Sequence, residues 1–205
     1  LFANLFSRYP YIVTSHYSPH FAKIFGDSIA EISPDLIICE WSPYAIYVKD
    51  IKSAKKIIVA HNIEHRIWQR YYENEMNPVK KWYIKRQWKK VAAFEQAAVG
   101  WVDGATTVSD IERRELKAMN GSLAVEEIEN GVDLDYFKGN GVEDEASVVF
   151  VGSMNWRPNQ DAINYFVQDI FPLIRKDYPK AAAIFIGQDP PPSITRLNRI
   201  PGINI

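Results

Sequence analysis

Polar side chains that could do chemistry follow two apolar runs in the first third of the chain. The segment EWS at 40–42 comes directly after the run LIIC at 36–39, and HNIEHR at 61–66 follows IIVA at 57–60. In parallel sheets, ligands bind where strands end at their carboxyl ends. We therefore expect both polar clusters to lie at a binding edge, where histidine and carboxylate groups can hydrogen-bond a polar substrate or move its protons.

Two interpretations of His61 stay open: a loop or capping histidine without function, or a binding-site histidine beside Glu40. His61 and His65 are four residues apart, a spacing that can bind a metal on a helix. However, Asn62-Ile63-Glu64 is not the zinc-protease arrangement, and His61 precedes the expected helix, so we predict no metal.

A second candidate site follows the apolar run VVFV at 148–151, which is typical of a buried strand. Gly152 and a polar loop come next, and a helix is expected to begin near Pro158. A glycine before a helix N-terminus can hold a phosphate, because free N–H groups and the helix dipole face it. Upstream, Asn130-Gly131 predicts a tight turn, and an acidic, glycine-containing connector at 139–145 predicts a seam between two α/β units.

The elements that position these residues alternate between strands and helices. In the first part we expect strands at 11–14, 36–39, 57–60, 104–108 and 125–129, and helices at 21–32, 43–51, 78–101 and 111–119. Ser109 and Glu112 match a capping box for the last of these helices. In the second part we expect strands at 148–151, 182–186 and from 203, and helices at 161–177 and 193–199.

A proline and an aspartate refine the second part. Pro172 predicts a kink or an early end in the helix at 161–177, and Asp189 predicts a cap for the helix at 193–199. The strands are apolar on both faces and alternate with helices, which predicts α/β folding with parallel sheets covered on both sides.

The helix at 78–101 carries an apolar stripe and a basic face that includes Lys81, Lys85, Arg86, Lys89 and Lys90. One interpretation is a surface helix with solvated lysines. The other is a peripheral membrane contact through the Lys80–Lys90 helix, with Trp82 and Tyr83 as interfacial anchors.

Composition narrows the classes of function. Residues 1–100 carry 14 Lys and Arg against 9 Asp and Glu, and residues 101–205 carry 10 against 16, a balance too mild to indicate nucleic acid. No apolar run is long enough to span a membrane. Cys39 is the only cysteine, which fits a reducing, cytoplasmic setting. The ends at Leu1 and Ile205 lead us to expect a fragment.

Several segments together resemble group 1 glycosyltransferases of the GT-B architecture. ENGVDLDYF at 129–137 is similar to the family's P-N-G-V-D-x-x-x-F, with Glu129 in place of proline. Phe94-Glu95 with DGATTVS at 103–109 is similar to E…D-x-v-x-x-V-S, and HNIE at 61–64 to H-N-x-E. VFVGSM at 149–154, with WRPN at 156–159 and Asp161-Ala162, resembles a bacterial subgroup that makes exopolysaccharide-type glycans. The resemblance extends from about Asp35 to Ile205.

The resemblance implies two Rossmann-like, doubly wound parallel-sheet domains, both incomplete in this chain. Residues 1–138 would form the acceptor-side domain with the hinge, and residues 139–205 the first half of the donor-nucleotide-binding domain. The implied reaction moves a sugar, with retention and without a metal or other cofactor, from a nucleotide-sugar donor to a hydroxyl of a glycan or lipid-linked acceptor. The implied setting is the cytoplasm or the inner face of the membrane.

The resemblance also assigns roles to residues. His61 matches the catalytic histidine facing the transferred sugar, and Asn130 and Gly131 match the hinge turn at the cleft. Gly152 and Ser153 match the loop whose amides face the donor diphosphate. Ser153 stands where many members have Arg, and Pro158 or Asn159 where they have Lys, so Arg157 is the nearby cation expected to bind diphosphate. The acceptor-side candidates are Glu40, Trp41, Glu64 and Arg66.

The family's paired glutamates do not occur within the 205 residues, so we expect this chain alone to be inactive. Two alternatives remain open. A nucleotide-sugar epimerase shares the architecture and needs acid–base groups in the cleft. A non-catalytic nucleotide- or glycan-binding module needs none.

Overall fold

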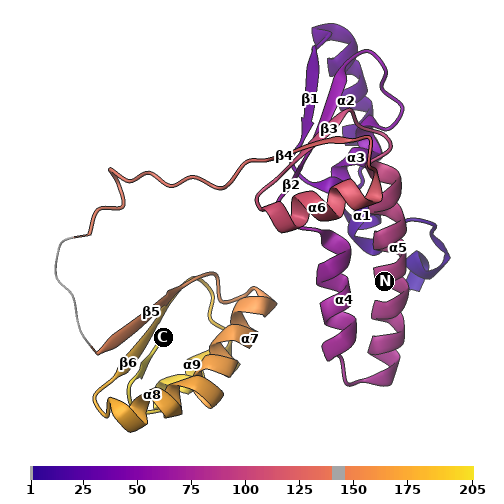
Figure 1. Cartoon of the computed structure of the whole chain (residues 1–205). Helices are drawn as coiled ribbons and strands as arrows, with labels where there is room; N and C mark the ends of the chain where they lie inside the picture. The colour runs from indigo at the N-terminus through magenta and orange to yellow at the C-terminus, as the bar shows by residue number, and fades with distance from the viewer. Residues whose placement is uncertain (1, 140–145) are drawn as a thin grey trace. The chain divides into compact units, whose positions relative to one another are not determined.

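The computed structural model describes residues 2–139 and 146–205, and the chain divides into two compact units, Leu1–Val132 and Asp133–Ile205 (Figure 1). Each unit contains a parallel sheet with helices between its strands, which confirms the α/β class with parallel sheets. Of the predicted acidic connector at 139–145, residues 140–145 lie outside the described residues.

The first unit holds a four-stranded sheet in the order β1-β2-β3-β4. Its elements are η1 (Phe2–Phe6), α1 (Tyr11–His16), α2 (Pro19–Ile32), β1 (Leu36–Cys39), η2 (Ser42–Tyr44), α3 (Ala45–Val48), β2 (Lys55–Ala60), α4 (Glu64–Asn74), α5 (Pro78–Ala98), β3 (Gly104–Thr107), α6 (Asp110–Met119) and β4 (Ala124–Glu127). The four strands from 36 onward and the helices at 21–32, 78–101 and 111–119 are confirmed with small shifts at their ends.

One face of this sheet is covered and the other is partly open. The paired residues Cys39, Ile58, Ala105 and Val125 are all buried on one face. On the opposite face, Ile38 of β1 is 56% exposed. The prediction of a sheet covered on both sides is therefore wrong here. Successive strands lie side by side in chain order, and right-handed crossovers then place the connecting helices on one face.

The second unit holds a three-stranded parallel sheet in the order β5-β6-β7. Its elements are β5 (Ser147–Val151), α7 (Arg157–Tyr165), the π-helical turn η3 (Phe166–Ile170), α8 (Phe171–Asp177), β6 (Ala182–Ile186), α9 (Pro192–Thr195), η4 (Arg196–Arg199) and β7 (Ile203–Asn204). The prediction that β5 is a buried strand is wrong, because none of its residues is buried and Val149 and Val151 are 54% and 74% exposed.

Neither sheet, within the described residues, contains the reversal of strand order that marks a doubly wound sheet. The observed orders are sequential in both units. The parallel α/β class is therefore what the fold establishes.

The strand predicted at 11–14 is wrong, because Tyr11–His16 forms α1. Its β-branched residues favour a strand locally. However, buried Gln87 accepts the Tyr11 N–H at 2.8 Å, and Val13 packs into the core at 2% exposure. A tertiary partner for a first-turn amide outweighs the local preference.

Pro172 interrupts the helix at 161–177 as predicted. The chain passes through the π-helical turn η3 before α8 resumes at Phe171, because proline lacks an N–H and clashes with the carbonyl four residues earlier. The predicted Asp189 cap is wrong. Asp189 has a left-handed φ of 51°, and extended Pro191 occupies the N-cap position of α9.

The tight turn predicted at Asn130-Gly131 is also wrong, since residues 128–133 form no helix, strand or turn. The chain turns later, where the Asp133 carboxylate accepts the amides of Asp135 and Tyr136 at 2.9 and 3.0 Å. Because the Asp133 side chain stabilises this later turn, the chain bends there and not at Gly131. Among the described helices, none is long and apolar enough to cross a membrane.

Candidate functional site

His61 and Glu40 meet at the carboxyl edge of the first sheet. Glu40 directly follows β1 and His61 directly follows β2, and the two strands are paired in parallel. His61 Nε2 lies 3.0 Å from Glu40 Oε2. Both side chains remain accessible, at 46% and 69% exposure. The expectation that the two polar clusters lie at one edge is borne out for this pair.

The pairing defines the roles of the two imidazole nitrogens. A carboxylate only accepts hydrogen bonds, so His61 Nε2 must donate to Glu40. In the neutral ring, Nδ1 is then the acceptor and can receive a hydrogen bond from a hydroxyl group. The pair therefore presents an oriented acceptor at an exposed sheet edge.

Trp41 and Glu64 form a second pair beneath this edge. Trp41 Nε1 donates to Glu64 Oε1 at 2.7 Å, and Glu64 is only 6% exposed. The pKa of Glu64 is raised above its ordinary value, chiefly because the carboxyl group is buried. The hydrogen bond from Trp41 opposes this shift, and the nearby Glu95 carboxylate adds to it. Glu64 thus lies under the edge as a support and does not open to solvent.

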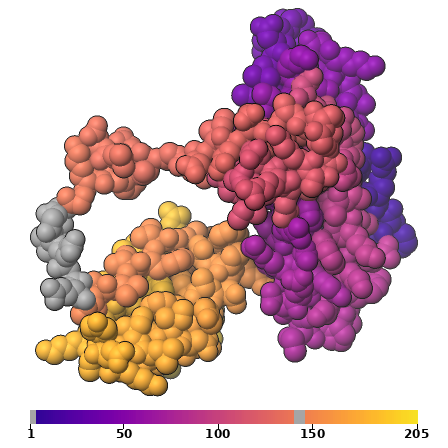
Figure 2. Space-filling model, viewed as in Figure 1, coloured from indigo at the N-terminus to yellow at the C-terminus, as the bar shows by residue number. Residues whose placement is uncertain are grey.

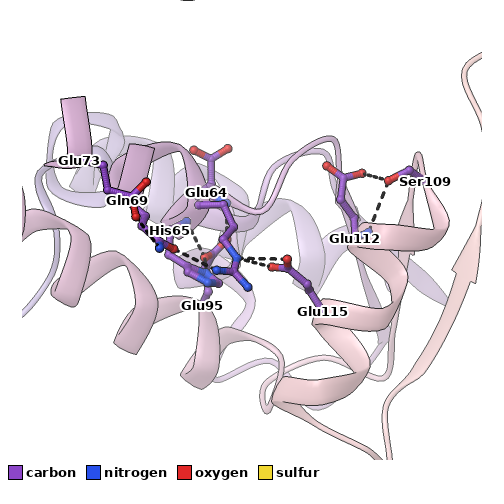
Figure 3. A network of polar contacts seen from close by, with 9 residues as sticks. Glu64, His65, Gln69, Glu73, Glu95, Ser109, Glu112 and Glu115 are labelled. Carbon is purple, nitrogen blue, oxygen red and sulfur yellow. Dashed lines mark hydrogen bonds and ion pairs between the residues drawn. The ribbon is translucent and has the colours of Figure 1, made fainter. Parts of the chain in front are cut away.

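Glu95 of α5 caps the start of α4. Its carboxylate accepts the backbone N–H of Glu64 at 2.8 Å, the N–H of His65 at 2.9 Å and His65 Nδ1 at 2.7 Å (Figure 3). The N-cap residue Ile63 offers no side-chain acceptor, so a distant carboxylate satisfies the free amides. This cap fixes the chain three residues after His61.

Arg66 is engaged by α6. Its Nε donates to both Glu115 oxygens, at 2.9 and 3.1 Å, and one terminal nitrogen donates to Gln69 (Figure 3). The hydrogen bonds and charge of Glu115 raise the pKa of Arg66. The Arg66 side chain is 49% exposed, so its remaining N–H groups could contact an acceptor while Nε stays on Glu115. Of the acceptor-side candidates, Glu40 is the exposed one nearest His61.

A hollow of about 450 Å³ adjoins the edge on the side of α2 and α3. Aromatic rings line much of it, and Glu40 and His16 contribute polar groups. The His16 ring meets the edge of Trp41 at 5.0 Å. Of the lining residues, sequence reasoning named only Glu40 as a site candidate; it missed His16, Tyr44 and Tyr47 among others. The aromatic density of residues 41–47 was the available signal.

Cys39 lies in the wall of this hollow but is not reactive. It is a free, buried thiol, and burial raises its pKa to about 11. A thiol that stays protonated is a poor nucleophile.

In the second unit, Gly152 follows β5 and Gly187 follows β6. The Gly152 N–H donates to the Ile186 carbonyl at 2.9 Å, and the Met154 N–H to the Gln188 carbonyl at 3.0 Å. A Cβ on Gly187 would lie 1.8 Å from the Gly152 carbonyl oxygen, so the two loops require glycine there. The Gly152 amide, predicted to face diphosphate, is used inside this loop pair.

The start of α7 is the other feature that the sequence predicts to bind diphosphate in this unit. Its N-cap residue Trp156 makes no side-chain cap, and Arg157 is the first helical residue. Ser153 Oγ lies 2.9 Å from Asn155 Oδ1, and Asn159 donates to the Ser153 carbonyl at 2.8 Å. Ser153 is thus tied into the loop before α7, whereas Asn130 and Gly131 belong to the first unit.

No group of three or more His, Cys, Asp or Glu side chains placed to hold a metal ion occurs within residues 2–139 and 146–205. No protein-family model matches the chain, and a search of curated proteins finds no match.

Proposed function

We propose that this chain is part of a retaining glycosyltransferase of the two-domain GT-B architecture, acting on a nucleotide-sugar donor. The observation that carries the proposal is the exposed His61–Glu40 pair at the carboxyl edge of paired parallel strands, beside a hollow of about 450 Å³. Its histidine belongs to HNIE at 61–64, the segment that resembles the family's H-N-x-E motif. Ligand sites in open parallel sheets lie at this edge.

In this proposal, Glu40 holds the His61 ring so that Nδ1 accepts a hydrogen bond from a hydroxyl of the transferred sugar. The acceptor oxygen bonds to the anomeric carbon while the bond to the diphosphate oxygen breaks. The acceptor's proton passes to the leaving diphosphate, and the new bond forms on the same face. The nearby hollow would receive the acceptor.

The uncapped N-terminus of α7, together with Arg157, would meet the diphosphate charge in the second unit. The Gly152 amide donates to Ile186, so this role does not depend on it. The scheme requires no metal, and we place the reaction in the cytoplasm.

The test is sugar transfer by the complete gene product with a panel of nucleotide-diphosphate sugars. We expect His61→Ala to lower kcat/KM about 100-fold, as for the loss of one oriented active-site hydrogen bond. Arg157→Ala should raise the KM for the donor about tenfold, through loss of a charged hydrogen bond. The matched controls are His20→Ala and Arg199→Ala, both exposed. Wild-type rates in His61→Ala and Arg157→Ala would refute the site assignment.

The same assay separates the alternatives. Epimerised sugar formed from the donor without any acceptor would favour an epimerase, to which the His61–Glu40 pair could supply acid–base groups. Calorimetric binding of a nucleoside diphosphate without turnover would favour a binding module.

A further inference from the structure

Helices α4 and α5 form a hairpin that extends beyond the first sheet (Figure 1) and appears as a purple and magenta lobe in Figure 2. The helices pack along their length, with Tyr72 stacked on Trp88 at 5.6 Å. The end of the hairpin carries exposed apolar side chains: Met76 at 90%, Val79 at 74% and Trp82 at 52% exposure. Three exposed apolar residues between positions 76 and 82 indicate a contact surface.

Two sides of α5 are already occupied. Toward α4, the Lys81 and Lys85 ammonium groups lie over the Tyr72 ring, at 5.2 and 5.4 Å. Toward the N-terminal segment, Gln87 is fully buried and Lys90 donates to the Asn4 carbonyl at 2.6 Å. The basic face expected from the sequence therefore does not include Lys90.

The free side of α5 combines apolar and basic residues. Val79, Trp82, Arg86 and Lys89 recur at intervals of three and four, and all are exposed. Arg86 lies over the Trp82 ring at 5.4 Å, and one of its terminal nitrogens donates to the Leu5 carbonyl at 3.5 Å, so it borders the N-terminal segment while it remains exposed. Lys80 is also exposed at the hairpin end.

Basic residues outnumber acidic ones at this end of the hairpin. From Met76 to Phe94 the chain has six Lys and Arg and no Asp or Glu. Two carboxylates lie near the end of α4 and keep their negative charge: Glu73, which accepts from Gln69, and Glu75, which accepts the Asn77 amide. The hairpin end is therefore net positive and apolar at its tip.

We infer that this hairpin end, defined as Met76, Val79, Lys80, Trp82, Arg86 and Lys89, binds the surface of a membrane that contains anionic lipids. The apolar tip and the indole ring suit the headgroup boundary, and the cations suit anionic headgroups. A nucleic acid would match the cations but would leave Met76 and Val79 without apolar contact. The inference is independent of sugar transfer.

The test is sedimentation of the 205-residue chain with phosphatidylcholine vesicles that contain or lack 30% phosphatidylserine. We expect binding to the anionic vesicles at low salt, and its loss near 1 M salt, where charges are screened beyond about 3 Å. Lys80→Glu/Lys89→Glu should weaken binding at least about 25-fold, since each cation near an anionic surface contributes about fivefold. Met76→Ser/Val79→Ser should weaken it about tenfold and keep its salt dependence.

The matched control is Lys52→Glu/Lys117→Glu, which makes the same change of charge at exposed positions of the first unit and should bind within about threefold of wild type. Circular dichroism checks that each variant is folded, and the salt series on the wild type needs no variant. The inference is overturned by equal binding to neutral vesicles, by unchanged binding of Lys80→Glu/Lys89→Glu, or by binding to a DNA oligonucleotide but not to vesicles.

Discussion

Glu95 accepts the backbone N–H of Glu64 at 2.8 Å, and so a carboxylate on α5 caps a helix that begins 31 residues earlier in the chain. The contact fixes the segment that follows β2 and carries His61. Two further hydrogen bonds, both from His65, reach the same carboxylate. The candidate site thus depends on a buried group that does not face the substrate.

Removing this cap should destabilise the first unit. Glu95→Ala leaves two buried amides without an acceptor, and we expect a loss of about 3 kcal/mol. Amide hydrogen exchange in β2 and β3 should then be roughly 100-fold faster. Glu95→Gln keeps one acceptor oxygen and should lose less, and Glu31→Ala, on the exposed part of α2, is the control. Equal exchange rates in Glu95→Ala and wild type would contradict the capping role.

Glu64 should make stability depend on pH. Its pKa is raised above the ordinary 4.5, so the folded protein holds this proton more tightly than the unfolded chain. Its contribution to stability is complete below pH 4.5 and is lost as the pH rises through the folded pKa. Glu64→Gln keeps an acceptor for Trp41 but cannot ionise. Urea unfolding between pH 4 and 8 should show the free energy of unfolding of the wild type falling relative to that of Glu64→Gln as the pH rises. A difference between the two proteins that does not change with pH would argue against a raised pKa of Glu64.

Gly187 should tolerate no side chain. In Gly187→Ala, the new Cβ would meet the Gly152 carbonyl oxygen, which is backbone and can move only with β5. Such overpacking costs about 2 kcal/mol, so exchange of β5 and β6 amides should be roughly 30-fold faster. Gly131→Ala, where nothing lies within 4 Å, is the control. Similar amide exchange rates in Gly187→Ala and Gly131→Ala would show that the loops after β5 and β6 can separate without loss of stability.

Local signals predicted the elements that local chemistry controls. Ser109 caps α6 as predicted by accepting the Glu112 amide at 3.4 Å, but the Glu112 carboxylate accepts from the Ser109 hydroxyl at 2.9 Å, where a full capping box has the Ser109 N–H. Pro172 interrupts its helix for an equally local reason. The errors have distant causes: buried Gln87 turns residues 11–14 into a helix, and strand order leaves one face of each sheet open.

The candidate site divides in the same way. His61 and Glu40 could be placed together because parallel strands bring their ends to one edge. Glu95 and Glu115 could not be connected to Glu64 and Arg66, because those contacts depend on how α5 and α6 pack against α4. The hydrogen-bond partner of Gly152 could not be predicted from the sequence, because it depends on where β6 ends.

Glu40 should act on sugar transfer only through His61. In Glu40→Gln the amide can rotate to donate or accept, so it no longer requires Nε2 to carry the proton. We expect kcat/KM of the complete gene product to fall about tenfold, less than the roughly 100-fold expected for His61→Ala. The double variant His61→Ala/Glu40→Gln should be no slower than His61→Ala, since residues that act as a unit are not additive. Glu31→Gln is the control. Additive losses would show instead that Glu40 contacts the acceptor itself, which its 69% exposure permits.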